Sequence, residues 1–389
     1  MKRDAVIVSA VRTAIARQGG ALATLPAHVY GAEVIKEAMR RANIGPELVD
    51  DVIMGNVLSG GGNIARLTAL KTGLSLGLTG LTVDRQCGSG INAVNLAAQA
   101  IWAGDGDVYI AGGVESMSRA PYLMDRPEKP YSSTPPNFRK SQLSPKEIGD
   151  PPMGITAENL VKKYSISREE QDAFALRSQQ RMARAMQEGR FDEQIVPITV
   201  PVKKGEPFVF DTDEHPRPNT TMEALAKLPP AFLEGGTVTA GNSSGLNDAA
   251  AALVVMSREK AEQLGLTPLA VIRAHAVAGV DPNIMGIGPV PATRKVLEKV
   301  GLTLDEMDII EINEAFAAQV IACDRELEMD PEKVNVNGGA IAHGHPLGAT
   351  GAILVTKAVY ELKRRGGTYA LITACIGGGQ GIATIIERE

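Results

Sequence analysis

The chain has 389 residues, of which 44% are hydrophobic and 22% are charged, and its formal net charge at pH 7 is −5. These ordinary values predict a globular protein and exclude a coiled coil, a collagen-like fibre and a disordered chain. The lack of a basic excess argues against nucleic acid or an anionic membrane as a partner. At about 100–200 residues per domain, the length predicts two or three domains.

The N-terminus and the cysteines bear on where the protein works. An apolar strand is expected from residue 5, without the long apolar stretch and cleavage site of a signal peptide. No uncharged apolar stretch of about 18 residues occurs, so no membrane span is expected. The three cysteines, Cys87, Cys323 and Cys375, are too few for a disulfide framework. We therefore expect a cytoplasmic protein with free thiols.

Strands and helices alternate along the first third of the chain. Short apolar runs at 6–8, 51–54 and 108–111 predict strands. Apolar residues at helical spacing, between 32 and 42 and between 91 and 101, predict helices. This order is typical of a mostly parallel sheet that is covered by helices.

The middle of the chain, from about residue 116 to 235, is polar and contains many prolines. Residues 124–153 have no clear periodicity and are expected to form an extended loop. Ser167 and Glu170 form the capping box of a helix that Gly189 ends. This capped helix favours an inserted, loop-rich subdomain over the alternative, a disordered linker.

Strands and helices alternate again near the end of the chain, with strands expected at 271–272, 309–310 and 369–372. Residues of the first half recur in the second half at a nearly constant offset, which indicates an internal duplication. The corresponding pairs are Asp51 and Asp308, Ile53 and Ile310, Asn56 and Asn313, Cys87 and His345, and Gly90 and Gly348. The predicted division is an N-terminal half of residues 1–115 and 236–265, an inserted loop subdomain of residues 116–235, and a C-terminal half of residues 266–389.

Cys87 begins the motif Cys-Gly-Ser-Gly at 87–90, where a strand ends, a glycine-rich turn follows and a helix begins. A thiol at a helix N-terminus loses its proton more easily, because it faces the positive end of the helix dipole. Gly88 and Gly90 allow a sharp turn with an exposed sulfur, similar in logic to a nucleophile elbow. These features favour a nucleophile, and the alternative is a buried structural cysteine.

A second candidate region, residues 335–351, holds His343 and His345 among several glycines. Pro346 is expected at the first position of a helix, which would place the His345 ring at a corner equivalent to that of Cys87. A cysteine and a histidine that meet between two halves have the geometry of a base-activated nucleophile. His343 is interpreted as a hydrogen-bonded structural histidine. Zinc is the competing interpretation, but the chain has no CxxC or HxxxH spacing, so no metal is expected.

Two more segments carry candidate residues. Cys375 precedes the glycines at 377–379, which suggest a backbone that approaches a ligand closely and offers N–H groups. The alternatives are a flexible turn with a buried thiol and, more weakly, a phosphate-binding loop that lacks the usual lysine. Asn313, at the end of an expected strand, is a candidate fixed donor. Glu314 is interpreted as a first-turn carboxylate of a helix, and Cys323 as a core residue.

Four motifs together resemble those of the thiolases. They are Cys-Gly-Ser-Gly at 87–90, Asn-Glu-Ala-Phe at 313–316, Gly-His-Pro at 344–346 and Cys-Ile-Gly-Gly-Gly at 375–379. The resemblance covers essentially the whole chain, including the residues at 237–248. It implies an α/β fold of two duplicated halves in five layers, αβαβα, with a loop subdomain inserted in the first half. Thiolases are usually homotetramers or homodimers.

The resemblance to acetyl-CoA acetyltransferases and 3-ketoacyl-CoA thiolases also implies catalytic roles. Cys87 corresponds to the acylated nucleophile, His345 to the base that activates it, and Cys375 to the acid/base that moves the proton at the substrate α-carbon. Asn313 would hold a water that, with His345, stabilises the thioester enolate. The N–H groups of Cys87 and Gly377 would form a second oxyanion hole. Such fixed donors lower the barrier, because the thioester oxygen develops negative charge.

Coenzyme A is the expected co-substrate, and no permanently bound cofactor is expected. The resemblance places Arg217 at the adenine end of coenzyme A and Ser244 beside its pantetheine arm. The apolar residues expected to line the acyl and pantetheine site are Met153, Phe232, Met285 and Phe316. Two positions depart from the family pattern, since Pro152 stands where a histidine is frequent and His343 where an aliphatic residue is common. These departures affect the pocket rather than the chemistry.

Several alternatives stay open. A condensing ketoacyl synthase of the same superfamily uses a Cys-His-His or Cys-His-Asn site, against which Cys375 argues. A non-catalytic lipid-binding relative would lack a reactive residue, and a cysteine hydrolase would turn over thioesters without coenzyme A. Among thiolases, Met153 favours acetoacetyl-CoA as substrate over the longer 3-ketoacyl-CoA of fatty-acid degradation.

Overall fold

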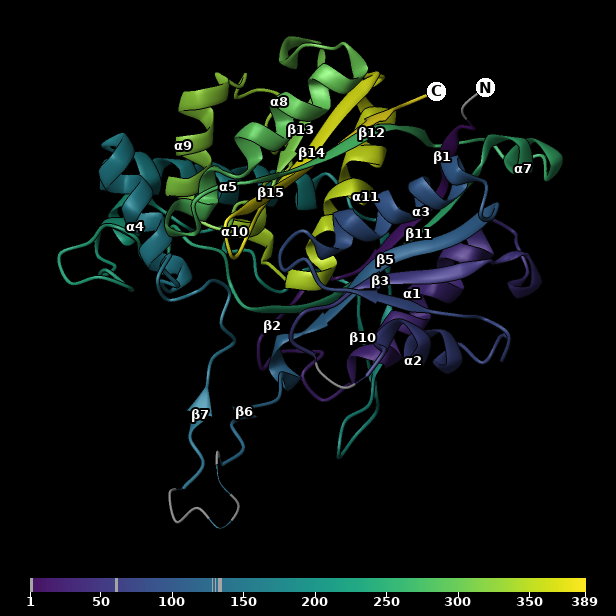
Figure 1. Ribbon diagram of the computed structural model, residues 1–389, viewed down its shortest axis with the longest axis horizontal. Helices are drawn as coiled ribbons and strands as arrows, with labels where there is room; N and C mark the ends of the chain where they lie inside the picture. Colours follow the sequence, from purple (N-terminus) through teal and green to yellow (C-terminus); the bar gives the residue numbers. More distant parts are fainter. Residues whose placement is uncertain (1–2, 60–61, 128, 130, 132–134) are drawn as a thin grey trace.

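Figure 1 shows the computed structural model of the chain, which describes residues 3–59, 62–127, 129, 131 and 135–389. Eleven strands of these residues form one large sheet: β1 (Ala5–Thr13), β2 (Ala16–Arg17), β3 (Asp51–Gly55), β4 (Leu81–Val83), β5 (Val108–Ser116), β8 (Ile195–Val196), β11 (Asn247–Ser257), β12 (Ala270–Gly279), β13 (Ile309–Ile312), β14 (Tyr369–Ile376) and β15 (Gln380–Glu387). The main path runs β13-β14-β15-β12-β1-β11-β5-β3-β4, while β2 pairs with β11 and β8 with β1.

The order of the strands repeats in the two halves of this sheet. On one side β3 is parallel to β5, β5 is antiparallel to β11, and β11 is antiparallel to β1. On the other side β13 is parallel to β14, β14 is antiparallel to β15, and β15 is antiparallel to β12. The halves meet where β1 runs antiparallel to β12. The predicted duplication is therefore present in the topology. The expectation of a mostly parallel sheet was wrong, because β11 and β15 each run antiparallel to both of their neighbours on the main path, and β1 and β12 are antiparallel to each other. The tight turn 377–379 between β14 and β15 permits only antiparallel pairing.

Helices form three layers around the two halves of the sheet. The middle layer is α3 (Ser89–Ala103) and α11 (Leu347–Arg365), and the outer layers are α1 (Ala27–Arg41) with α2 (Ile64–Lys71) and α8 (Pro289–Val300) with α9 (Ala317–Leu327) (Figure 1). In β11, alternate residues from 249 to 255 pack into the central core, and those from 250 to 256 pack under α1. Both faces of this strand are therefore apolar, as a sheet between two helical layers requires. The five-layered αβαβα fold is confirmed.

The two middle helices touch backbone to backbone near their N-terminal ends. A Cβ added at Gly90 of α3 would lie 2.6 Å from the backbone nitrogen of Ala352 in α11. A Cβ added at Gly351 would lie 2.2 Å from the backbone nitrogen of Ile91. Only glycine permits such an approach. The contact brings the start of α3, which Cys87 precedes, beside the start of α11, which His345 precedes.

The segment between β5 and β11 returns to the large sheet only at β8, and its described residues carry three α-helices and two small strand pairs outside that sheet. They are α4 (Met153–Tyr164), α5 (Arg168–Gln187) and α6 (Met222–Ala226), with β9 (Ile198–Val200) beside β10 (Phe208–Phe210) and β6 (Leu123–Met124) beside β7 (Phe138–Arg139). The capping box predicted for α5 is formed, since Ser167 N donates to Glu170 Oε2 at 2.7 Å. The stretch 124–153 is not one uniform loop, because β6 and β7 pair in an arm that projects from the body (Figure 1).

The remaining helical turns are short. They are α7 (Arg258–Gln263), α10 (Ala340–His343) and the 3-10 turns Pro46–Leu48, Met117–Arg119, Pro282–Ile287 and Leu304–Glu306. Across the described ranges, no helix has both the length and the apolar character needed to cross a bilayer.

Candidate active site

His345 lies in the short connection between α10 and α11. Pro346 is the N-cap of α11 rather than its first helical residue, so the expected position was off by one. The preceding Gly344 has φ +97°, and a Cβ there would lie 2.3 Å from the side chain of Asn247. Asn247 Oδ1 accepts a hydrogen bond from the backbone N–H of His345 at 2.9 Å. Asn247 therefore holds the backbone on which the imidazole is mounted.

Both nitrogens of the buried His345 ring have a polar neighbour. Nδ1 lies 2.7 Å from Thr350 Oγ1, and Nε2 lies 3.3 Å from Asn313 Nδ2. Burial lowers the pKa of His345 to about 4, because the charged imidazolium is poorly solvated inside the protein. The ring is thus neutral at pH 7 and can accept a proton.

Cys87 sits in a turn between β4 and α3. Gln86, just before it, has φ +45°, a conformation that costs energy for a residue with a side chain and is found at functional sites. Burial raises the pKa of Cys87 to about 11, although hydrogen bonds from the backbone N–H of Gly377 and of Cys87 itself lower it. Cys87 is partly exposed, but the expectation that its thiol ionises easily was wrong. Desolvation outweighs the helix N-terminus, and the thiol needs a base.

Cys375 and Gly377 approach Cys87 from β14 and the turn that follows it. Cys375 is fully buried, and burial followed by the proximity of Cys87 raises its pKa. A Cβ at Gly377 would lie 3.0 Å from Leu143 Cδ1 and 3.9 Å from Gln86 Cγ. The turn is therefore packed against the residue that precedes the candidate nucleophile.

Asn313 and Glu314 follow β13 and are both buried. Asn313 Oδ1 has no hydrogen-bond partner among the described residues, and a buried polar atom of this kind requires one. Glu314 is not a first-turn carboxylate, because α9 begins only at Ala317. Instead it accepts hydrogen bonds from Ser178 Oγ at 2.7 Å and Asn335 Nδ2 at 2.8 Å. These bonds fix the segment that presents Asn313 to His345.

Cys323 is a core residue, as predicted. It is fully buried in α9, and its Sγ donates to the carbonyl oxygen of Gly286 at 3.2 Å. Within the described residues, no three His, Cys, Asp or Glu side chains are grouped as ligands for a metal ion.

A groove of about 750 Å³ lies beside this cluster. Arg217, Phe232 and Ser244 line it, so the structure brings together three of the six residues expected to contact coenzyme A. Leu246, also in the wall, makes a backbone bridge to His345. One wall of the groove is therefore joined through Leu246 to the backbone of the candidate base.

The other three expected contact residues lie around Cys375. Met285 and Phe316 are buried in one apolar cluster with Cys375, and Met153 packs against the cluster from the first turn of α4. Phe316 meets Phe232 edge to face, with ring centroids 5.9 Å apart. The two sets of residues are thus continuous, from the groove to the buried thiol.

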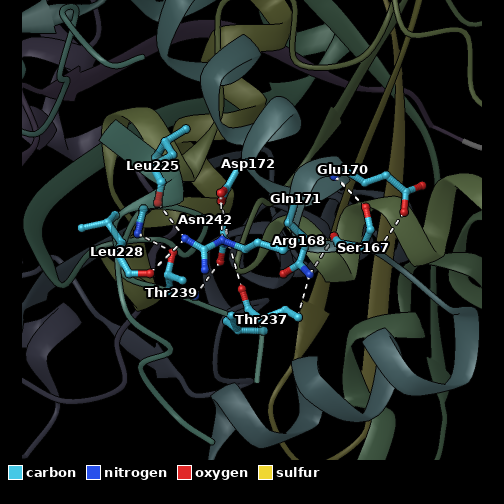
Figure 2. A network of polar contacts seen from close by, with 12 residues as sticks. Ser167, Arg168, Glu170, Gln171, Asp172, Leu225, Leu228, Thr237, Thr239 and Asn242 are labelled. Atoms are coloured by element: carbon cyan, nitrogen blue, oxygen red, sulfur yellow. Dashed lines mark hydrogen bonds and ion pairs between the residues drawn. The ribbon is translucent and has the colours of Figure 1, made fainter. Parts of the chain in front are cut away.

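Figure 2 shows the polar network that supports one wall of the groove. Arg168 donates from Nε to Asp172 Oδ2 at 2.8 Å, and from Nη2 to the carbonyl oxygens of Leu225 at 2.6 Å and Leu228 at 3.0 Å. Asp172 Oδ1 accepts from Asn242 Nδ2 at 3.0 Å. Leu225 and Leu228 both line the groove. Side chains of α5 thereby fix the end of α6 and the turn at Asn242 relative to each other.

Comparison with known sequences identifies the family. The family model described as "Thiolase, N-terminal domain" matches residues 5–259, and "Thiolase, C-terminal domain" matches residues 266–388. The chain belongs to the thiolase family. This thiolase is 51% identical to an acetyl-CoA acetyltransferase of Pseudomonas aeruginosa over 100% of both chains.

Solved structures agree with this family assignment. The crystal structure of the Bacillus anthracis acetyl-CoA acetyltransferase is similar with a TM-score of 0.96 and 46% identity, covering 100% of this chain and 99% of that one. The human mitochondrial 3-ketoacyl-CoA thiolase in complex with CoA is similar with a TM-score of 0.93 and 44% identity, covering 100% and 98%. Enzymes of this family are acyltransferases.

Three residues of this thiolase site were not predicted from the sequence. Gln86 has a positive φ, Asn247 holds the backbone of His345, and Thr350 contacts its ring. Thr350 follows Pro346 by four residues, which is a spacing that places a hydroxyl over the start of a helix. That spacing could have indicated Thr350 from the sequence. Neither the positive φ of Gln86 nor the contact of Asn247 with His345 can be predicted from neighbouring residues.

Proposed function

We propose that this thiolase is an acetyl-CoA acetyltransferase that cleaves acetoacetyl-CoA with coenzyme A and catalyses the reverse Claisen condensation of two acetyl-CoA. The observation that carries the proposal is the neutral, buried His345, which precedes α11 at the point where α11 touches the start of α3, the helix that Cys87 precedes. Curated relatives that span the whole chain at about half identity bear this name. The N–H of Gly377, which bonds Cys87, supports it as well.

In the first half-reaction, Nε2 of His345 takes the proton of Cys87 and the thiolate attacks the keto carbon of acetoacetyl-CoA. The bond between the α-carbon and this carbon breaks, which leaves acetyl-Cys87 and the enolate of acetyl-CoA. Cys375 then donates its proton to the α-carbon, and acetyl-CoA departs. Asn313 and His345 stabilise the enolate oxygen, Asn313 through a water. A base-activated nucleophile that forms an acyl-enzyme gives ping-pong kinetics.

In the second half-reaction, the thiol of coenzyme A gives its proton to the Cys375 thiolate and attacks acetyl-Cys87. The N–H groups of Cys87 and Gly377 receive the developing oxyanion. Collapse of this intermediate releases acetyl-CoA, and the Cys87 thiolate recovers its proton from His345. The two half-reactions together therefore return His345, Cys87 and Cys375 to their starting protonation states.

Coenzyme A is proposed to occupy the 750 Å³ groove as co-substrate. Arg217 would meet its adenine end and Ser244 its pantetheine arm, while Phe232 leads toward the reacting thioester. Met153, Met285 and Phe316 would enclose the acyl group beside Cys375. The human thiolase solved in complex with CoA supports the ligand class.

We also propose the broader setting that the family implies. The protein would work in the cytoplasm, in fatty-acid metabolism, as a homotetramer or homodimer. Its organisation would be two halves, residues 1–115 with 236–265 and residues 266–389, around an inserted loop subdomain of residues 116–235. Sedimentation of the purified protein tests the oligomeric state.

The proposed function is tested by mixing acetoacetyl-CoA with coenzyme A and following loss of the ultraviolet enolate band. The band should disappear only when coenzyme A is present, with two acetyl-CoA formed per acetoacetyl-CoA consumed. Loss of the band without coenzyme A would instead indicate a hydrolase. A kcat/KM series over longer 3-ketoacyl-CoA substrates tests the second candidate, a longer-chain thiolase, and we expect it to fall with chain length.

The proposed role of Cys375 predicts that the two half-reactions can be separated. Changing Cys375 to serine replaces a thiol by a much weaker acid, so proton transfer at carbon should slow by about 10²- to 10⁴-fold. Acetylation of Cys87 by acetyl-CoA needs no proton moved at carbon and should survive better. The measurement compares Cys87 acetylation with acetoacetyl-CoA thiolysis in Cys375→Ser. An equal, large fall in both would mean that Cys375 acts on Cys87 or is structural.

A further inference from the structure

We infer that Thr350 is a positioning residue that fixes the tautomer of His345, keeping the ring proton on Nδ1 so that Nε2 carries the lone pair. The inference rests on the proposed role of His345 as the base. A base presents a lone pair at the reacting side, and a neutral imidazole has one such nitrogen and one N–H. The hydrogen-bond partners of each nitrogen therefore decide whether the ring can act.

The first line of argument is at Nδ1. Thr350 Oγ1 lies 2.7 Å from His345 Nδ1 and 3.0 Å from the carbonyl oxygen of Pro346. A hydroxyl has one hydrogen, and a carbonyl oxygen can only accept. The hydrogen of Thr350 is therefore directed to Pro346, four residues earlier in the chain. Toward His345, the oxygen of the Thr350 hydroxyl can therefore only accept a hydrogen bond. The donor of that bond is Nδ1, so Nδ1 is the ring nitrogen that carries the proton.

The second line of argument is at the other end of the ring. Nε2 lies 3.3 Å from Asn313 Nδ2. An amide nitrogen can only donate, so this contact requires a lone pair on Nε2. Two contacts from different elements, one on α11 and one after β13, thus specify the same tautomer. Thr350 is fully buried and His345 is 5% exposed, so bulk water does not compete for either contact.

The arrangement also suits the proton transfer itself. When Nε2 takes the proton of Cys87, the ring becomes an imidazolium that donates from both nitrogens. Thr350 Oγ1 still accepts from Nδ1–H, so this hydrogen bond is kept and strengthened by the charge. The ring need not rotate between its two protonation states. Without the Thr350 hydroxyl, nothing at Nδ1 would favour the reactive tautomer.

The chain offers a matched control on the same helix. Thr356 is also fully buried in α11, and its Oγ1 donates to the carbonyl oxygen of Ala352 at 2.9 Å, again four residues earlier. Within the described part of the chain, its hydroxyl forms no hydrogen bond with a histidine. Thr356→Val removes a hydroxyl from the same environment as Thr350→Val does, without touching the site.

The experiment measures kcat/KM for thiolysis and the tautomer of His345 in Thr350→Val, Thr350→Ser and Thr356→Val. We expect Thr350→Val to lose about 10- to 100-fold in kcat/KM, as when an orienting partner of a functional histidine is removed. Thr350→Ser keeps the hydroxyl and should recover most of the activity, and Thr356→Val should match the parent enzyme. Full activity in Thr350→Val, or a loss in Thr350→Ser as large as in Thr350→Val, would overturn the inference.

Nitrogen NMR of protein labelled at its five histidines reads the tautomer directly, with His345→Gln identifying the signal. The parent enzyme should show a protonated Nδ1 and an unprotonated Nε2, and Thr350→Val should show a mixture. A parent enzyme with its proton on Nε2 would overturn the inference even if no Thr350 variant folds. Unchanged activity in His345→Ala would instead overturn the proposed function, which is a separate result.

Discussion

Replacing Cys87 by alanine is expected to lower kcat for acetoacetyl-CoA thiolysis by about 10⁵- to 10⁶-fold, because no acyl-enzyme can form. The parent protein incubated with acetyl-CoA should gain one acetyl group on the peptide that carries Cys87. Cys87→Ala should gain none, and peptide mass spectrometry measures both.

Cys323→Ala is the matched control for this labelling. Cys323 is a buried cysteine in the core of the C-terminal half, with its thiol bonded to the carbonyl oxygen of Gly286. Its loss should leave acetylation of Cys87 unchanged, although the cavity lowers the free energy of unfolding. Acetyl groups found only on Cys323 or Cys375 would contradict the assignment of the nucleophile.

Removing His345, the proposed base, should lower kcat nearly as much as removing Cys87. His345→Ala is expected to lower kcat by about 10⁴- to 10⁶-fold, because the pKa of the Cys87 thiol is raised and the thiol does not ionise unaided at neutral pH. His343→Ala is the control, since His343 is equally buried and only two residues away. Its Nδ1 bonds to the carbonyl oxygen of Gly344 at 2.8 Å rather than contacting Asn313.

Kinetics and thermal melting of the two histidine variants decide between their roles. We expect His343→Ala to reduce the melting temperature while keeping most of kcat. We expect His345→Ala to lose most of kcat while keeping most of the melting temperature. A larger loss of kcat in His343→Ala than in His345→Ala would refute the correspondence of His345 with Cys87 in the duplicated halves.

The pKa of His345 also sets the sign of the pH dependence. Burial lowers this pKa to about 4, so the ring remains an unprotonated base where an ordinary histidine would become charged. The kcat/KM of the parent enzyme should therefore change little as the pH falls from about 8 to about 6, and decline only toward the lowered pKa. A decline centred near the ordinary value of about 6.5 would contradict the assignment. Circular dichroism at each pH separates loss of the base from unfolding.

The sequence was sufficient for features that depend on short spacing. Alternating strands and helices, the capping box at Ser167 and the recurrence of Cys87 as His345 were all visible without coordinates. The glycines that follow Cys375 indicated a turn whose backbone could approach a ligand closely. Such features follow from periodicity, capping and turn chemistry, which act over a few residues and are read directly from residue types.

Charges inside the fold were not visible in the same way. Lys357 and Glu311 form a buried ion pair at 2.8 Å, with side chains 2% and 0% exposed. Glu314 is likewise buried, and burial raises its pKa. In the sequence these residues look like ordinary helix or strand-end charges. Segments distant in the chain cover these residues and so determine their environment. The same segments determine the free-energy cost of burying their charges.

The sequence by itself determined the family and the candidate residues, because Cys87, His345, Cys375 and Asn313 stand in motifs whose order and spacing are those of a thiolase. Only the tertiary structure decided their state. The direction of the Cys87 pKa shift, opposite to the expectation from its helix, comes from desolvation by segments far away in the chain. The tautomer of His345 depends on hydrogen bonds from two other elements that meet at the ring. Both are properties of the surroundings rather than of the residue, and surroundings exist only once the two halves have packed together.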